Sequence, residues 1–194
     1  MRGDAVKSEA NFRAHPEGHA FAVELIGQVQ GMNKGHYFTE GQGQDPTHFC
    51  IGAAAYPEKH FEAMNLETDL QYLKAKVDAG ASYLVTQMFF DNQKYFDFVA
   101  AAKKTGIHVP ILPGIKPFAI HKHLQLLPQV FKIDLPEALI AAVEGCKDNA
   151  QVRQVGVEWA IQQSKELQQA GVPGLHYYSM GKASNIKKIA AALF

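Results

Sequence analysis

The chain has 194 residues, 47% of them hydrophobic, and its 19 basic residues balance 19 acidic ones. This length and composition suit a single domain over residues 1–194 with a substantial buried core. The balanced charge gives no general attraction to nucleic acid or to an anionic membrane, and no apolar run reaches the ~18 residues of a membrane span, so neither partner is expected.

Apolar periodicity predicts helices that alternate with short apolar strands. The helix over residues 92–106 is typical, because Tyr95, Phe98 and Ala102 recur at i, i+3 and i+7 on one face. In chain order, we expect helices over residues 20–32, 66–80, 92–106, 136–145, 150–170 and 186–193, and strands over residues 49–55, 82–88, 108–112 and 175–178.

Two segments end in residues that an ordinary core strand would not carry. Thr86–Asp91 delivers the polar amide of Gln87 and two aromatic rings to a strand end, and Pro110–Pro117 brings the next strand to a stop at a Pro113-Gly114 corner. Strand, helix and strand with both strands apolar indicates a parallel βαβ unit. We therefore expect both motifs at the carboxyl ends of neighbouring parallel strands, where α/β proteins place their chemistry.

Four strands, each followed by helical sequence, fit either a doubly wound sheet or part of a (β/α)8 TIM barrel. A complete barrel usually needs about 250 residues, and this chain begins on what resembles the end of a strand, Met1–Asp4. We therefore expect an incomplete barrel that lacks the first strands because of truncation. A Rossmann unit is less favoured, because Gly41-Gln42-Gly43 has no visible strand before it and no helix after it.

The cysteines and the first residues bear on the compartment. Cys50 lies in an apolar run and Cys146 near a helix end, without the spacing of a disulfide framework or a metal motif. The segment Met1–Ala5 has no apolar stretch typical of a secretion signal. We expect free thiols, a cytoplasmic location and no metal site.

Six motifs resemble, in the same order, those of the methylenetetrahydrofolate reductase family, flavin-dependent (β/α)8-barrel enzymes that make 5-methyltetrahydrofolate. They are Arg2–Asp4, Ala54–His60, Lys76–Ala81, Thr86–Asp91, Pro113–Pro117 and His176–Met180. The resemblance extends over essentially the whole chain, which corresponds to the C-terminal two-thirds of the family's catalytic barrel. The motifs resemble those of bacterial members. It implies FAD as cofactor, NADH or NADPH as co-substrate, 5,10-methylenetetrahydrofolate as substrate, a role in one-carbon metabolism and methionine biosynthesis, and a homo-oligomer at full length.

The resemblance also implies which residues bind the cofactor. Asp4 is expected beside the flavin ring, where its carboxylate tunes the flavin and so has a catalytic role, and Asp69 and Lys76 share a helix face with Tyr72. The full set of predicted FAD-binding residues is Arg2, Gly3, Asp4, Tyr56, His60, Asp69 and Lys76.

Three further residues are implied for the folate. Gln87 offers one acceptor and two donors, the complement of a pterin edge, and is the second predicted catalytic residue. His123 occupies a position where the family usually carries Gln, so substrate affinity and pH dependence are open. Lys182 matches a basic position that holds the glutamate tail, although Lys lacks the bidentate fork of Arg.

One expected part is missing and two other functions stay open. The family's general acid, which acts on the folate, is a glutamate on an early strand that this sequence does not contain. We therefore expect the chain alone to show no folate reduction, with Glu58 as the first acid to test if it does. The alternatives are a non-catalytic partial barrel that binds flavin or a partner, and another (β/α)-barrel enzyme acting on a phosphorylated metabolite. The absence of a glycine-rich phosphate loop disfavours the second.

Overall fold

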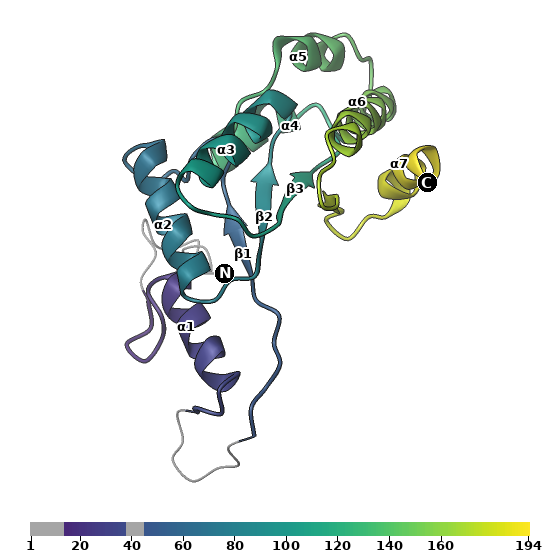
Figure 1. Cartoon of the computed structure of the whole chain (residues 1–194). Helices are drawn as coiled ribbons and strands as arrows, with labels where there is room; N and C mark the ends of the chain where they lie inside the picture. The colour runs from purple at the N-terminus through teal and green to yellow at the C-terminus, as the bar shows by residue number, and fades with distance from the viewer. Residues whose placement is uncertain (1–13, 38–44) are drawn as a thin grey trace.

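The computed structural model describes residues 14–37 and 45–194, and Figure 1 shows how their elements are arranged. The Asp148 carboxylate begins the longest helix by accepting the Ala150 and Gln151 N–H groups, as an N-cap residue does. The helices are α1 (Ala22–Met32), α2 (Leu66–Asp78), α3 (Asn92–Lys104), α4 (His123–Phe131), α5 (Glu137–Glu144), α6 (Asn149–Gln169) and α7 (Ser184–Leu193), and the strands are β1 (Gly52–Ala55), β2 (Tyr83–Met88), β3 (Ile111–Ile115) and β4 (His176–Tyr177).

The four strands form one parallel sheet in the order β1-β2-β3-β4. A doubly wound sheet reverses its strand order at a switch point, and no reversal occurs among the described strands. Helices connect the strands, as parallel pairing requires. The structure therefore confirms the mixed α/β class with a parallel sheet.

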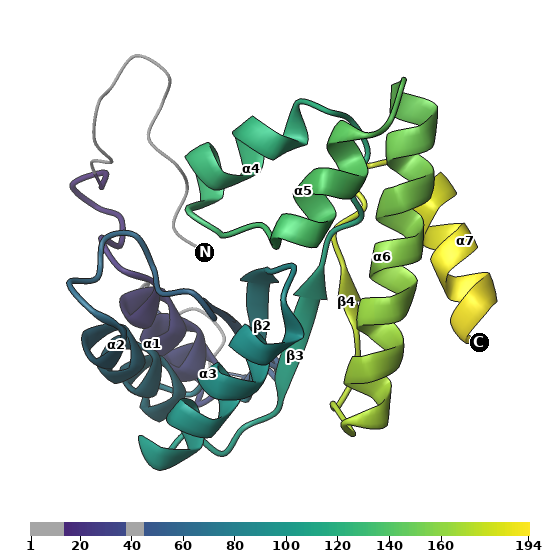
Figure 2. The same cartoon turned by 90° about the horizontal axis from the view of Figure 1, so that it is seen from above.

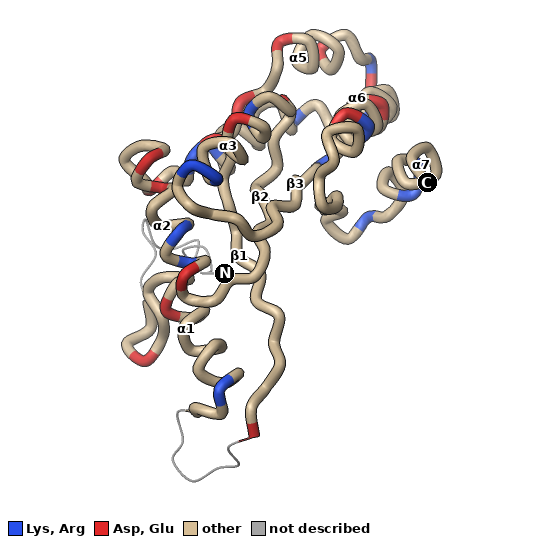
Figure 3. The backbone as a smooth tube through the Cα atoms, viewed as in Figure 1, with Lys and Arg blue, Asp and Glu red and all other residues tan. Residues whose placement is uncertain are grey.

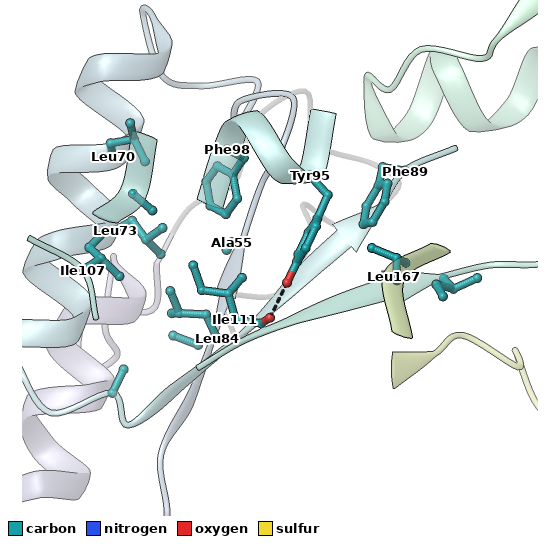
Figure 4. Close-up of a cluster of buried hydrophobic side chains, with 14 of the residues drawn as sticks. Ala55, Leu70, Leu73, Leu84, Phe89, Tyr95, Phe98, Ile107, Ile111 and Leu167 are labelled. Atoms are coloured by element: carbon teal, nitrogen blue, oxygen red, sulfur yellow. Dashed lines mark hydrogen bonds between the residues drawn. The ribbon is translucent and has the colours of Figure 1, made fainter. Parts of the chain in front are cut away.

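One face of the sheet forms the main core with the helices. Ala55, Leu84 and Ile111, one from each of β1, β2 and β3, belong to a buried cluster with side chains from α2, α3, α6 and α7. Figure 4 shows how the Tyr95 hydroxyl reaches the Ile111 carbonyl oxygen, to which it donates at 2.7 Å. Burial raises the pKa of Tyr95 to about 12, so the hydroxyl keeps its proton and the bond joins α3 to β3.

The opposite face of the sheet is apolar but only half buried. Ala54, Val85 and Leu112 lie in register across β1, β2 and β3, and each is partly exposed. Burial alternates along β2, so Gln87 falls on the same face as Val85, nearer the carboxyl end.

A second, smaller core lies past the carboxyl ends of the strands, where Figure 2 shows α4 and α5 beyond the arrowheads of β2 and β3. The rings of Phe90 and Phe118 meet there edge to face, 5.4 Å between centroids. Gly156 of α6 allows this packing, because a Cβ on it would lie 2.1 Å from the Phe118 carbonyl oxygen.

The third strand differs from the prediction, because it runs through Pro113-Gly114 instead of stopping there. Pro113 has no N–H, and the pairing of β2 with β3 is irregular between Val85 and Met88. The Gly114 N–H donates to the Thr86 hydroxyl at 2.8 Å. The Pro-Gly pair therefore marks an irregularity inside the strand, not its end.

Charged residues lie on helices and loops, while the four strands carry none, as Figure 3 shows. Cys50 and Cys146 are both free thiols, as predicted. Among the residues that the structure describes, no helix is long and apolar enough to span a bilayer.

Candidate functional site

Four of the predicted cofactor-binding residues gather around the loop from β1 to α2. The rings of Tyr56 and His60 meet edge to face, with centroids 4.6 Å apart. The His60 backbone N–H donates to Asp69 Oδ2 at 2.8 Å, and the Lys76 ammonium lies 6.0 Å from the centroid of the Tyr56 ring. Residues predicted from separate motifs thus form one group, the β1–α2 cluster of Tyr56, His60, Asp69 and Lys76.

This cluster holds a buried anion and a partly buried cation. Asp69 is 8% exposed, and Lys76 Nζ donates to the Ala54 carbonyl oxygen at 3.1 Å. Burial lowers the pKa of Lys76, and the negative charge of Asp69 opposes that shift. An ammonium has three donors, so Lys76 can bind an anion without giving up Ala54.

Tyr72, expected on the same helix face, does not join the cluster. It is 58% exposed, because position i+3 lies about 60° around the helix from position i, whereas i+7 returns nearly to it. Asp69 and Lys76 therefore turn inward together, and Tyr72 turns to solvent.

Gln87 lies beside this cluster, in a pocket at the carboxyl ends of β1 and β2. The pocket is lined by residues 56–59, 87–88 and 131–133, so Tyr56 belongs to both the pocket and the cluster. Gln87 is partly buried, and its Oε1 accepts the Met88 N–H at 3.0 Å. An amide oxygen has two lone pairs, so Oε1 can accept a second donor from a ligand while it keeps this bond.

The same pocket has an acidic wall that the predicted site did not include. Glu58 Oε2 accepts from Lys94 Nζ at 2.7 Å and from the Asp134 backbone N–H at 2.8 Å, and Lys94 also pairs with the Asp134 carboxylate. These three residues come from the β1–α2 loop, α3 and the α4–α5 loop. No local sequence pattern links segments so far apart, and the only signal was Glu58 itself, an acidic residue in the loop that follows the first predicted strand.

The structure places His123 at the start of α4, outside the contacts of Gln87. Its Nδ1 accepts the Ala119 N–H at 3.3 Å, and its ring packs edge to face on Phe118. Burial, and then the charge of Lys116, lower the pKa of His123 to about 4. The imidazole is therefore neutral at pH 7.

Lys182 lies on the exposed loop between β4 and α7. Its backbone N–H donates to the Ser179 carbonyl oxygen at 3.0 Å, and within the described part of the chain it lines neither the Gln87 pocket nor the β1–α2 cluster. Arg2, Gly3 and Asp4 lie outside the described residues, so their predicted roles stay predictions.

A parallel sheet with aromatic, amide and charged side chains at the carboxyl ends of its strands defines a class: α/β proteins that bind small molecules at that edge. The family model described as "Methylenetetrahydrofolate reductase" matches residues 1–193. The chain therefore belongs to the methylenetetrahydrofolate reductase family, as its motifs predicted.

Known relatives carry the same family name. A "Methylenetetrahydrofolate reductase (NADH) 1" of Arabidopsis thaliana is 34% identical, over 100% of this chain and 32% of that protein. The "5,10-methylenetetrahydrofolate reductase" of Escherichia coli is 38% identical, over 70% of this chain and 46% of that protein. The "Probable methylenetetrahydrofolate reductase (NADPH)" of Caenorhabditis elegans is 34% identical, over 75% of this chain and 22% of that protein. The chain thus spans less than half the length of each of these three relatives.

Among solved structures, an uncharacterized protein from Clostridium thermocellum that binds two copies of 5-methyl-5,6,7,8-tetrahydrofolic acid matches with a TM-score of 0.48. It is 21% identical, over 73% of this chain and 51% of that chain.

Proposed function

We propose that this protein takes part in the FAD-dependent reduction of 5,10-methylenetetrahydrofolate to 5-methyltetrahydrofolate by NADH or NADPH. The observation that carries the proposal is the position of Tyr56, which belongs both to the β1–α2 cluster and to the pocket of Gln87. The residues predicted for cofactor and for folate therefore adjoin, as a shared hydride-transfer site requires.

The half-buried face of the sheet supports a barrel for this site. Ala54, Val85 and Leu112 form one apolar row across three strands, and a barrel interior is filled by such layers of side chains. We propose that residues 1–194 belong to one (β/α)8-barrel domain, with the half-buried face inside the barrel.

The donor set fits FAD. Lys76 offers a cation for the diphosphate, Tyr56 and His60 offer aromatic surface and a polar edge, and Asp69 holds the loop by accepting the His60 N–H. Bound FAD would supply hydride transfer between the nicotinamide and the folate. The chain's own residues bind and orient both ligands.

On the folate side, Gln87 would pair with the donors and acceptors of the pterin ring. Arg2, Gly3 and Asp4 would complete the flavin contacts, and His123 and Lys182 would contact the substrate. A place in methionine biosynthesis, a cytoplasmic location and a homo-oligomeric full-length protein belong to the same proposal.

Anaerobic reduction of bound flavin tests this function. The purified chain, loaded with FAD and freed of excess, should keep the flavin absorption band, and NADH or NADPH should bleach it. The nicotinamide that bleaches it faster is the preferred donor. A chain that keeps no FAD would contradict the cofactor assignment, and bound FAD that neither nicotinamide reduces would contradict the oxidoreductase assignment.

A further inference from the structure

The Glu58 carboxylate has one oxygen with two partners and one with none. Oε2 accepts from Lys94 and from the Asp134 backbone. Oε1 is buried and has no hydrogen-bond partner among the described residues. A buried acceptor without a donor is unfavourable, so a polar atom left in this condition points to a partner that binds from outside the protein.

The unpaired oxygen belongs to the wall of the pocket that also contains Gln87. Glu58 follows Tyr56-Pro57 at the end of β1, its side chain is 10% exposed, and it lines the pocket with Gln87 and Tyr56. Phe131–Ile133 line the same pocket, directly before Asp134. Lys94 and Glu58 therefore hold both the carboxylate and the 131–134 segment in place.

The charges of this group favour a donor at Oε1. Two carboxylates, Glu58 and Asp134, share the single ammonium of Lys94. Burial raises the pKa of Glu58, although the hydrogen bonds from Lys94 and Asp134 oppose the shift. One ammonium therefore balances only one of the two negative charges. A proton or an N–H donor at Oε1 would stabilise the remaining negative charge.

We infer that Glu58 is a further ligand-binding residue of this pocket: its Oε1 accepts an N–H donor of the bound ligand, and Lys94 is the positioning residue that aims it. The inference rests on the proposed function, which supplies two ligands with such donors, the amino-pyrimidine edge of the pterin and the carboxamide of the nicotinamide. Because Oε1 is buried in the ligand-free protein, the residues that cover it must move aside when the ligand enters.

The substitution Glu58→Gln separates a direct contact between Glu58 and the ligand from the structural contacts of Glu58 with Lys94 and Asp134. The Gln carbonyl oxygen can still accept from Lys94 and Asp134, while its NH2 group replaces the unpaired acceptor with a donor. We expect binding of 5-methyltetrahydrofolate or of NADH, titrated separately in the presence of FAD, to weaken about ten- to a hundred-fold. If only the folate affinity falls, the pterin edge is the group that donates to Glu58. If the NADH affinity falls, the nicotinamide carboxamide is that group. Glu144→Gln, at an exposed glutamate, should change neither affinity.

Hydrogen exchange of the Asp134 amide tests whether Glu58→Gln weakens ligand binding through a lost ligand contact or through a disturbed pocket. This N–H donates to Glu58 Oε2, so its exchange should stay slow in Glu58→Gln, rise at least tenfold in Lys94→Met and return towards the original rate in Lys94→Arg. Fast exchange of the Asp134 amide in Glu58→Gln would show that Glu58 has only a structural role and would overturn the inference. Unchanged affinity for both ligands would overturn it as well. If the unmodified chain binds neither ligand, the proposed function itself fails, and the inference falls with it.

Discussion

Gln87 connects sequence to function at the scale of one residue. Its amide lies near the carboxyl end of the apolar strand β2, and among the described residues its oxygen accepts the adjacent Met88 N–H alone. Replacing it with Leu should leave FAD affinity unchanged and weaken 5-methyltetrahydrofolate binding about ten- to a hundred-fold, because only the pterin needs a matched polar edge. Parallel titrations of both ligands check this. Equal losses for FAD and folate would show that Gln87 supports the pocket in general.

His123 makes stability depend on pH. Its pKa in the folded protein is about 4, against an ordinary 6.5, so the unfolded chain takes up this proton first as pH falls. The free energy of unfolding should therefore decrease between pH 6.5 and about 4, by about 1–2 kcal/mol after allowance for solvent screening at a partly buried ring.

Urea unfolding of His123→Gln at several pH values measures this contribution. The difference in unfolding free energy between the two proteins should change over that pH range and stay constant above it. His108→Gln, at an exposed histidine, is the matched control and should run parallel to the unmodified chain. If the difference in unfolding free energy between His123→Gln and the unmodified chain were the same at every pH, the His123 ring would have the same pKa in the folded and unfolded chains.

Several single residues could be assigned from the sequence and others could not. Tyr56, His60, Asp69 and Lys76 were predicted as a set through the family resemblance, and the structure brings them together. Lys94 and Asp134 meet Glu58 only through the fold. Their pairing depends on how distant loops pack, which no periodicity encodes.

At the scale of elements, prediction succeeded where one face of a segment is buried. Long periodic helices such as α3 and α6 lie within a few residues of their expected bounds. The apolar runs before β1 and β3 led to strands that begin too early, at Phe49 and His108. Helix α4 was not among the helices predicted from periodicity, because Pro128 lies inside it and obscures its pattern.

The contact between α6 and the backbone of Phe118 can be tested with two glycines. Gly156→Ala should destabilise the protein by about 1–3 kcal/mol despite the better helix propensity of Ala, because its Cβ would lie 2.1 Å from a backbone oxygen. Gly27→Ala in α1 meets nothing within 4 Å and should stabilise by about 0.5–1 kcal/mol. Thermal unfolding of both variants decides this, and stabilisation by both would contradict the close approach.

For the whole molecule, the sheet order and the half-buried apolar face fit the barrel that the family resemblance implies. The pattern of apolar strands and helices was enough to predict a parallel α/β fold, but it left doubly wound and barrel arrangements open. The order β1-β2-β3-β4 favours the barrel. The functional edge follows from that order, since parallel strands bring all their carboxyl ends to one side.

We propose that the carboxyl edge around β1 and α2 binds FAD, and fluorescence titration of the chain with FAD tests this binding most directly. We predict saturable one-to-one binding that Lys76→Met weakens about ten- to a hundred-fold, because a charge-assisted contact to phosphate is lost. Lys104→Met, which removes an exposed cation at the end of α3, should bind FAD like the unmodified chain. Equal affinity of the Lys76→Met and unmodified chains, or no binding by either, would contradict FAD binding at this edge.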